Sequence, residues 1–288
     1  MSEKLKRILT GIQSTGIPHL GNILGAIIPA INFSKQNDVE TYFFIADFHS
    51  LTQIKDSKEL KQNTLYTASA WLACGLDPSR TVFYRQSDVP QVTELAWYLS
   101  CFFPYNRLRL AHSFKDKKDR LKDVNSGLFN YPMLMAADIL LYDANIVPVG
   151  KDQLQHLEIT RNVANRFHNV FGETFILPNE YLQEESKLIT GTDGEKMSKS
   201  KNNIINIFAS ENELKKQIKS IETDSTELDS PKEWRTCNLF NIYKLIADEN
   251  QIDKMKSKYE AGGYGYGLSL IHISEPTRPR LSSYAVFC

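Results

Sequence analysis

Short apolar segments of strand character alternate with helical segments over roughly the first 200 residues of this chain, and no other feature constrains the fold as strongly. Strands that are joined through helices pair in parallel within one sheet. We therefore predict an α/β domain with a doubly wound parallel sheet, in which ligands bind beyond the carboxyl ends of the strands. The predicted strands are residues 7–12, 41–46, 81–86 and 146–149, and the predicted helices are residues 20–33, 57–74, 93–103, 131–143 and 152–167.

The pattern changes near Glu211, where a Lys- and Glu-rich helical periodicity begins and no clear strand follows. We predict a nucleotide-binding α/β domain at residues 1–205 and a smaller α-helical domain at residues 206–267. The remaining residues, 268–288, contain two prolines and show no helical apolar face. They also resemble the in-frame translation of a sequencing-library adapter. We therefore expect a non-native tail and a helical domain that is only partial.

Composition excludes several classes of protein. Lys plus Arg and Asp plus Glu number 34 each, and 42% of the residues are hydrophobic, so the chain is neither disordered nor a general polyanion binder. No apolar run approaches the ~20 residues that span a bilayer. The four cysteines lie far apart and the six histidines lack metal-ligand spacing, so we predict no disulfide framework and no metal site. We expect a cytoplasmic protein without membrane contact.

A glycine-containing segment, residues 10–22, follows the first predicted strand. Gly11 and Gly16 permit a tight loop, and Gly21 lets a ligand approach the first turn of the next helix. Free N–H groups at a helix start attract phosphate, and His19 can add a hydrogen bond there. For the glycines alone, an ordinary turn between a strand and a helix is the better interpretation.

A lysine-bearing polar loop, residues 194–200, follows the predicted α/β domain. Lys196 and Lys199 could clamp a polyphosphate as charge develops on it. Taken alone, such a run is typical of a solvated surface. Together with the first segment it is more specific, because His19-Leu20-Gly21-Asn22 and Lys196-Met-Ser-Lys-Ser200 resemble the HIGH and KMSKS signatures of class I aminoacyl-tRNA synthetases.

A third segment, residues 131–156, places an acidic residue among apolar ones. Tyr131, Met135 and Asp138 have the spacing i, i+4 and i+7, and therefore share one face of the predicted helix. One interpretation is a carboxylate that accepts a hydrogen bond inside an aromatic-sized slot, which would reject analogues that lack the donor. The alternative is an aspartate whose carboxylate is satisfied by backbone N–H groups at a helix end.

This third segment resembles the bacterial tryptophanyl-tRNA synthetases, and the resemblance extends over about residues 7–267. It includes Gly11-Ile-Gln13, Asp47-Phe-His49 and Thr223-Asp-Ser225. The resemblance implies that Asp138 accepts the indole N–H of tryptophan. The other implied tryptophan-binding residues are Met135, Val147, Val149, Leu9 and His49 around the indole, with Tyr131 and Gln153 at the ammonium group. The implied ATP-binding residues are Gln13, Ser14, Thr15, Gly21, Asn22, Gly150, Lys151, Asp152, Leu188, Lys196, Met197, Ser198 and Lys199.

The resemblance also implies the reaction and the partners. Tryptophan would be activated by ATP to an adenylate and then transferred to tRNA(Trp), with Mg²⁺ accompanying ATP and without a dedicated protein site. His19, Lys196 and Lys199 would be the catalytic residues, because they would stabilise developing charge. A homodimer that reads the anticodon with its helical domain is the expected assembly.

Two other functions stay open at this point. A tyrosyl-tRNA synthetase shares the fold and both signatures, but it requires polar partners for a phenol hydroxyl at the end of the slot. An inactive paralogue that binds nucleotide or tRNA as a partner or regulator is the second alternative. The mixed-charge run at residues 115–120 is predicted to be a solvated loop, with a tRNA contact as the other reading.

Overall fold

The computed structural model describes residues 5–111, 124–182, 189–206 and 208–270. The contacts between Cα atoms divide the chain into two compact units, each built from several segments. We call them the sheet unit and the helical unit. The sheet unit comprises Met1–Gly16, Ala30–Ala68 and Leu76–Glu185, and the helical unit comprises Ile17–Pro29, Ser69–Gly75 and Ser186–Cys288.

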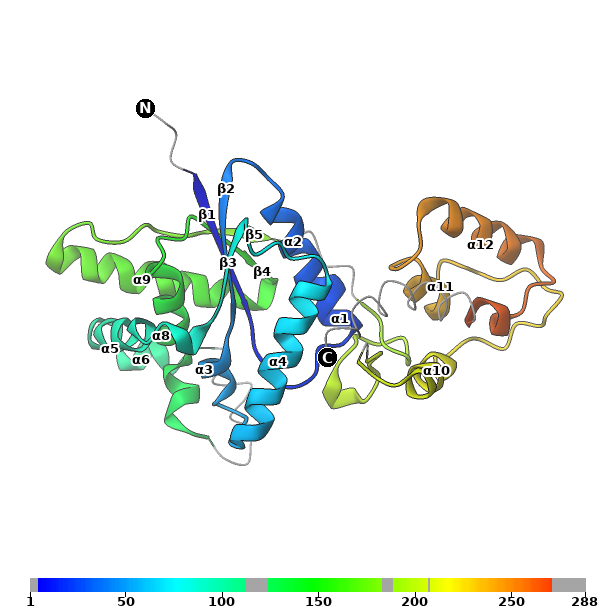
Figure 1. The fold of residues 1–288 in the computed structure, drawn as a ribbon, viewed down its shortest axis with the longest axis horizontal. Coiled ribbons are helices and arrows are strands. Elements are labelled where there is room, and N and C mark those ends of the chain that lie inside the picture. Colours follow the sequence, from blue (N-terminus) through cyan, green and yellow to red (C-terminus); the bar gives the residue numbers. More distant parts are fainter. Residues whose placement is uncertain (1–4, 112–123, 183–188, 207, 271–288) are drawn as a thin grey trace. The chain divides into compact units, whose positions relative to one another are not determined.

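The sheet unit is built on five parallel strands in the order β3-β2-β1-β4-β5 (Figure 1). The strand order reverses between β1 and β4, which makes this point the topological switch of a doubly wound sheet. The predicted fold class is therefore confirmed, with all four predicted strands present. The strands are β1 (Lys6–Ile12), β2 (Val39–Ile45), β3 (Thr81–Arg85), β4 (Ile146–Val149) and β5 (Asn179–Leu182).

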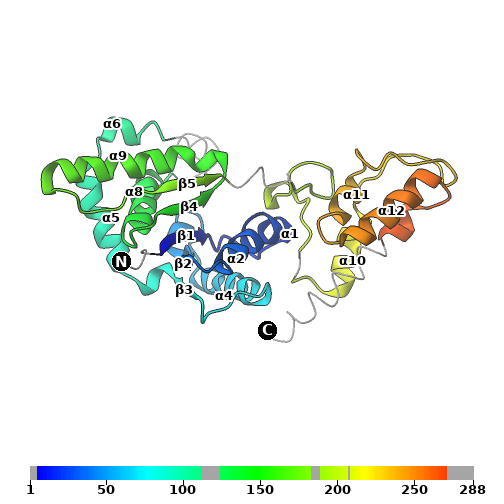
Figure 2. The same cartoon turned by 90° about the horizontal axis from the view of Figure 1, so that it is seen from above.

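Helices cover both faces of this sheet, with α8 and α9 on one face and α2 and α4 on the other (Figure 2). The predicted helix at residues 131–143 in fact begins earlier, because the Asn125 side chain accepts the Leu128 N–H and caps it. These helices are α2 (Ile28–Ser34), α3 (Asp47–Ser50), α4 (Ser57–Ala73), α5 (Gln91–Phe102), α6 (Tyr105–Leu108), α8 (Ser126–Leu140) and α9 (Leu154–Phe171). Two 3₁₀ segments, Gln86–Asp88 and Lys151–Gln153, follow β3 and β4.

Strand β5 is absent from the predicted elements. All four of its residues are exposed, and it pairs with β4 alone at the edge of the sheet. An edge strand of this kind has neither an apolar run nor a period-2 pattern to reveal it. The sequence pattern of residues 179–182 therefore does not predict β5.

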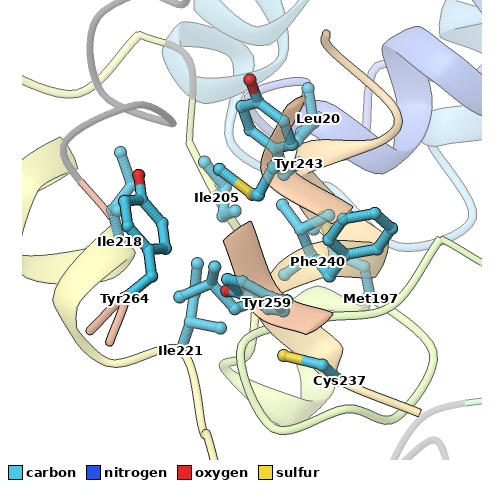
Figure 3. Packing of buried hydrophobic residues seen from close by; sticks show 13 residues of the cluster. Leu20, Met197, Ile205, Ile218, Ile221, Cys237, Phe240, Tyr243, Tyr259 and Tyr264 are labelled. Atoms are coloured by element: carbon cyan, nitrogen blue, oxygen red, sulfur yellow. The ribbon is translucent and has the colours of Figure 1, made fainter. Parts of the chain in front are cut away.

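The helical unit contains its own apolar core (Figure 3). Residues from α10, α11 and α12, whose bounds are given below, contribute to it, together with Leu20 and Met197. The predicted helix at residues 20–33 is present but is interrupted by a π-helical segment, Ile23–Ile27. The helices of this unit are α1 (Leu20–Asn22), α10 (Glu211–Lys219), α11 (Asn238–Tyr243) and α12 (Glu249–Ala261).

The first residues of the predicted tail differ from the expectation. Residues 266–270 are helical, Ser269 is fully buried, and Leu270 packs against the core of the helical unit. The Tyr259 hydroxyl donates a hydrogen bond to Ser269 Oγ at 2.9 Å, and the Tyr266 hydroxyl donates to Asp224 Oδ1 at 2.7 Å. A short helix therefore continues through residues 268–270 and packs against the helical unit, and the non-native tail at residues 268–288 stays a prediction.

Several features expected from the sequence stay predictions. The domain boundaries at residues 1–205, 206–267 and 268–288 stay a prediction, because compact contact units are not a measure of independent folding. Leu188, residues 115–120 and residues 271–288 lie outside the described residues. Within the described residues, no helix combines the length and apolarity needed to cross a membrane.

Candidate active site

The carboxylate of Asp138 on α8 is buried in the sheet unit, where the residue is 3% exposed. His49 Nε2 lies 2.8 Å from Asp138 Oδ2, and Gln86 Nε2 donates to Oδ1 at 2.8 Å and to Oδ2 at 3.0 Å. Both partners are side chains, so the alternative in which backbone N–H groups satisfy Asp138 is wrong. Burial raises the pKa of Asp138, and the hydrogen bonds from His49 and Gln86 oppose that rise because they stabilise the charged form.

Gln86 is the functional residue that the motif analysis missed. It follows β3 directly, and its Oε1 accepts the backbone N–H groups of Phe48 and His49 at 3.1 and 3.4 Å. The residue is 1% exposed. Through its hydrogen bonds, the side chain connects the carboxyl ends of β2 and β3 with α8. Its place at a strand end was a usable signal, since parallel strands gather ligand-binding groups at that edge.

Tyr131 closes one side of the same site. Its ring contacts the His49 ring edge-on, with 4.6 Å between centroids, and the His156 ring at 5.3 Å. Its hydroxyl forms a side-chain hydrogen bond with Gln13, and burial raises the pKa of Tyr131 to about 12. The structure thus brings Tyr131, His49 and Asp138 together, as the sequence predicts, and adds Gln13 to them.

The apolar residues assigned to the slot share one cluster in the sheet unit. Leu9 on β1 and Val147 and Val149 on β4 are all less than 10% exposed, and Met135 packs against them. Because β1 and β4 flank the topological switch, this cluster lies at the position where doubly wound sheets bind ligands. Met135 lies on α8, the helix that also carries Asp138, so this helix contributes both to the cluster and to the buried carboxylate.

The residues that follow β4 form a short polar turn. Gln153 Nε2 donates to Asp152 Oδ2 at 2.9 Å, and Lys151 and Asp152 are exposed. A Cβ atom at Gly150 would lie 2.8 Å from Asp152 Oδ1, so a larger residue there would displace the Asp152 side chain. The turn begins at the carboxyl end of β4, and the φ of Gly150, −75°, is one that other residues also adopt.

The segment after β1 is anchored on the α3 region. Ser14 is fully buried, its backbone N–H donates to Ser50 Oγ at 2.9 Å, and its own hydroxyl lies 3.2 Å from the same oxygen. Thr64 donates to Ser14 Oγ at 3.3 Å. Thr15, by contrast, is only partly buried. The polar groups of Ser14 are engaged within the protein, and its contact with ATP stays a prediction.

In the helical unit, the two signature segments meet. His19 and Asn206 form an isolated antiparallel bridge, and Leu20 N–H donates to Ile205 O at 3.0 Å. Gly21 N–H points at Met197 Sδ, 3.3 Å away. Asn22 Oδ1 accepts the backbone N–H of His19 at 3.1 Å. These contacts hold His19 and the lysine-bearing loop side by side.

A buried carboxamide fixes the shape of the lysine-bearing loop. Asn203, 2% exposed, accepts the Ser198 N–H at 2.7 Å and donates to Asp193 Oδ1 and to Lys196 O. Met197 inserts into the apolar core of the helical unit, where Figure 3 shows it in one cluster with Leu20. Lys196 and Lys199 remain exposed on this anchored loop.

The electrostatics around His19 favour a neutral imidazole. The ring is 7% exposed, and burial, with a smaller contribution from the Lys199 ammonium, lowers the pKa of His19 to about 4. Partial desolvation also lowers the pKa of Lys199. A neutral His19 can donate one hydrogen bond to an anion while the neighbouring lysines supply the positive charge.

We expect the His19 ring to titrate near pH 4 in the folded protein, well below the ordinary histidine value of about 6.5. Histidine-ring NMR signals followed from pH 3.5 to 8 measure this, and a His19→Gln variant assigns the resonance. The urea-unfolded chain is the reference, because every histidine should titrate near 6.5 there. A folded-state midpoint near 6.5 would show that His19 is solvated and charged in mild acid.

Comparisons with known proteins identify the family of the chain. The family described as tRNA synthetases class I (W and Y) matches residues 1–278. The tryptophan–tRNA ligase of Campylobacter jejuni (strain RM1221) is 49% identical over 269 residues, which are 93% of this chain and 84% of that protein. The chain belongs to the tryptophanyl-tRNA synthetases.

A second tryptophan–tRNA ligase, from Rhodopirellula baltica, is 47% identical over 261 residues, covering 91% of this chain and 81% of that protein. The solved tryptophanyl-tRNA synthetase from Campylobacter jejuni, complexed with ADP and tryptophan, superposes with a TM-score of 0.91. That structure is 47% identical, and the match covers 96% of this chain and 86% of the other.

A tyrosyl-tRNA synthetase from Archaeoglobus fulgidus, complexed with L-tyrosine, also superposes, with a TM-score of 0.70 and 18% identity. At that identity the likeness shows a shared fold only. The tryptophanyl-tRNA synthetases are therefore similar to this chain in sequence and in fold, whereas this tyrosyl-tRNA synthetase supports the fold alone.

Proposed function

We propose that this chain is a class I tryptophan–tRNA ligase, which activates L-tryptophan with ATP and transfers it to tRNA(Trp). The observation that carries the proposal is the buried Asp138 carboxylate beside the apolar cluster of Leu9, Val147 and Val149. This geometry suits a flat ring with one N–H donor. The proposal is supported by ligase relatives that are 47% to 49% identical.

The amino-acid site lies in the sheet unit. The indole would lie on the apolar cluster with Met135 and donate its N–H to Asp138, while His49 holds the carboxylate from the other side. Tyr131 and Gln153 would bind the ammonium group. A site built this way discriminates strongly against side chains that lack the donor, because the carboxylate would then be buried without its partner.

The ATP site would combine groups from several segments. Gln13, Ser14 and Thr15 follow β1 and Gly150, Lys151 and Asp152 follow β4, at the edge where doubly wound sheets bind nucleotides. The other residues proposed to bind ATP belong to the helical unit, and they are Gly21, Asn22, Leu188, Met197 and Ser198. Mg²⁺ prefers substrate phosphates and a few carboxylates, and the described residues offer no cluster of three His, Cys, Asp or Glu that could hold a metal. We therefore treat magnesium as part of the MgATP substrate.

The reaction requires positioning and charge stabilisation rather than a side-chain nucleophile. A tryptophan carboxylate oxygen attacks the α-phosphorus of ATP, a C–O–P linkage forms, and the bond to the bridging oxygen breaks, so that pyrophosphate leaves with that electron pair. His19, Lys196 and Lys199 would stabilise the charge that develops on the phosphates. A ribose hydroxyl at the tRNA 3′ end then attacks the acyl carbon, loses its proton, and displaces AMP.

Pyrophosphate exchange tests this function directly. We expect exchange of labelled pyrophosphate into ATP in the presence of L-tryptophan and none above background with L-tyrosine. Exchange with tyrosine in place of tryptophan would identify a tyrosyl-tRNA synthetase. No exchange with either amino acid would favour the inactive paralogue.

Exposed aromatic and aliphatic side chains gather on α5, α6 and α9 and support a homodimer as part of the proposal. Trp97 is 71% exposed, Tyr105 63% and Phe171 60%. Phe171 also contacts Phe102 of α5 through its ring, so α5 and α9 form one surface. Large apolar side chains that cluster on a surface mark interaction sites.

We expect Trp97→Asp to convert the dimer to a monomer, because the substitution places a charge in the apolar surface. Size-exclusion chromatography with light scattering over a range of protein concentrations measures the mass. Leu65→Asp on α4 is the matched control, since Leu65 is 53% exposed and lies away from α5, α6 and α9 along the chain. A wild-type monomer, or an unchanged dimer in the Trp97 variant, would contradict this assembly.

The tRNA partner and the location complete the proposal. With equal numbers of basic and acidic residues, tRNA binding would rely on a local basic patch and weaken steeply with salt. Among the described residues, Cys74, Cys101 and Cys237 are free thiols, which is the state that a reducing cytoplasm maintains. We therefore propose that the enzyme works in the cytoplasm.

A further inference from the structure

The Gln86 side chain has a single workable orientation. Its Nε2 donates to both oxygens of Asp138, and its Oε1 accepts the N–H groups of Phe48 and His49. A flipped amide would place its oxygen against a carboxylate and its NH₂ group against two other donors, and every contact would become repulsive. The carboxamide is therefore held at both ends and cannot adapt to a different partner.

The residues around Gln86 fix its backbone as well. The Ser87 N–H donates to Asp47 Oδ1 at 3.0 Å, and the Ser87 hydroxyl donates to Asp47 Oδ2. Asp47 is 7% exposed and lies at the carboxyl end of β2. This contact ties the residue after Gln86 to the neighbouring strand, so that neither the backbone nor the amide of Gln86 can move away from Asp138.

Three of the acceptor positions of Asp138 are thereby taken, two by Gln86 and one by His49. An ionised carboxylate offers about four such positions. The remaining position on the Asp138 carboxylate can only accept a hydrogen bond, and its direction is fixed. A protonated Asp138, or one that rotated freely, could donate a hydrogen bond as well, and it would then select poorly between ligands with and without an N–H group.

We propose that Gln86 is a specificity-determining positioning residue, which holds Asp138 as a fixed, acceptor-only group so that the site selects amino acids whose ring brings an N–H donor. Gln86 acts through Asp138 and does not itself touch the amino acid. The inference rests on the proposed function, because it takes Asp138 as the group that receives the indole N–H.

The test compares two amino acids in two variants. L-Tryptophan and L-benzothienylalanine, in which sulfur replaces the ring N–H, are assayed by pyrophosphate exchange, and their kcat/KM ratio is the selectivity. Gln86→Met keeps the length of the side chain but cannot donate. We expect its selectivity to fall by roughly 10- to 150-fold, because a hydrogen bond to a charged group contributes ~1.5–3 kcal/mol. Gln91→Met, the same change at an exposed position on α5, should leave the selectivity unaltered.

A purely structural role for Gln86 predicts a different result. Loss of packing would lower kcat/KM for both amino acids by the same factor and leave their ratio intact, and that outcome would overturn the proposal. If the methionine variant fails to fold by circular dichroism, Gln86→Glu is assayed in the same way. The Glu side chain keeps an acceptor for the two backbone N–H groups but places a second carboxyl group against Asp138. The two carboxyl groups would have to share a proton, Asp138 would no longer be an acceptor only, and the selectivity should again fall.

The experiment separates this inference from the proposed function. A wild-type enzyme without preference for tryptophan over the sulfur analogue, or an Asp138→Asn variant that keeps the preference, would contradict the assignment of Asp138 itself. A wild-type preference that Asp138→Asn abolishes and Gln86→Met retains would overturn only the role of Gln86.

Discussion

Replacement of Lys199 by alanine is expected to slow tryptophan activation about 10²- to 10³-fold while the affinity for tryptophan stays nearly unchanged. Loss of one electrostatic contact to a developing charge costs ~2.7–4 kcal/mol of transition-state stabilisation. Lys199 lies close enough to His19 to lower the pKa of that imidazole, so both groups face the same region of the helical unit. Tryptophan is proposed to bind in the sheet unit, and its affinity should therefore be spared.

Single-turnover formation of the adenylate, with tryptophan binding measured separately by calorimetry, checks this prediction. Lys201→Ala is the matched control, because Lys201 is exposed, lies two residues further along the loop and pairs with Glu195 at 3.4 Å. We expect the control to change the rate little. A Lys199→Ala variant with the activation rate of the wild type would remove Lys199 from the catalytic residues.

The second large effect is expected from Asp138→Asn. His49 Nε2 and Gln86 Nε2 both point at the carboxylate, and the indole N–H would be a third donor. An asparagine amide has one acceptor oxygen, and its NH₂ group would have to face one of these donors. We expect kcat/KM for tryptophan to fall by roughly 10- to 150-fold, which corresponds to the ~1.5–3 kcal/mol of a hydrogen bond to a charged group.

Pyrophosphate exchange over a range of tryptophan concentrations measures this loss, with thermal unfolding recorded alongside. Asp143→Asn provides the control, since Asp143 is partly exposed and its positive φ of 51° suits asparagine equally well. Tryptophan use that survives unaltered in Asp138→Asn would show that the indole N–H is bound elsewhere.

The sequence predicts most of the strands and helices of the α/β domain because local patterns determine these elements. Residues 7–12, 41–46 and 146–149 are apolar runs, and the structure places β1, β2 and β4 there within two residues at either end. The helix before Cys74 begins as predicted, with Asp56 accepting the Glu59 N–H at 2.7 Å. In each case the signal lies within a few residues of the element that it specifies.

The parts that escaped prediction depend on partners distant in the chain. Gln86 is separated from Asp138 by 52 residues, and its place at the end of a strand is the one local signal, which does not reveal the carboxylate that it contacts. Likewise, the role of Asn203 becomes visible only once the lysine-bearing loop has folded around its side chain. The role of a polar residue depends on the groups that it contacts in the folded protein. A single sequence predicts those contacts only when the residue lies in a known motif.

The distribution of the site residues between the two units has a consequence for changing the amino-acid specificity of this enzyme. His19 and residues 196–200 belong with the C-terminal helices, whereas Asp138, Gln86 and His49 belong with the strands. Under the proposed function, the residues that recognise the indole N–H therefore all belong to the sheet unit, and the three proposed catalytic residues all belong to the helical unit. Substitutions among Asp138, Gln86 and His49 should alter which ring is recognised, while His19, Lys196 and Lys199 keep their contacts within the helical unit.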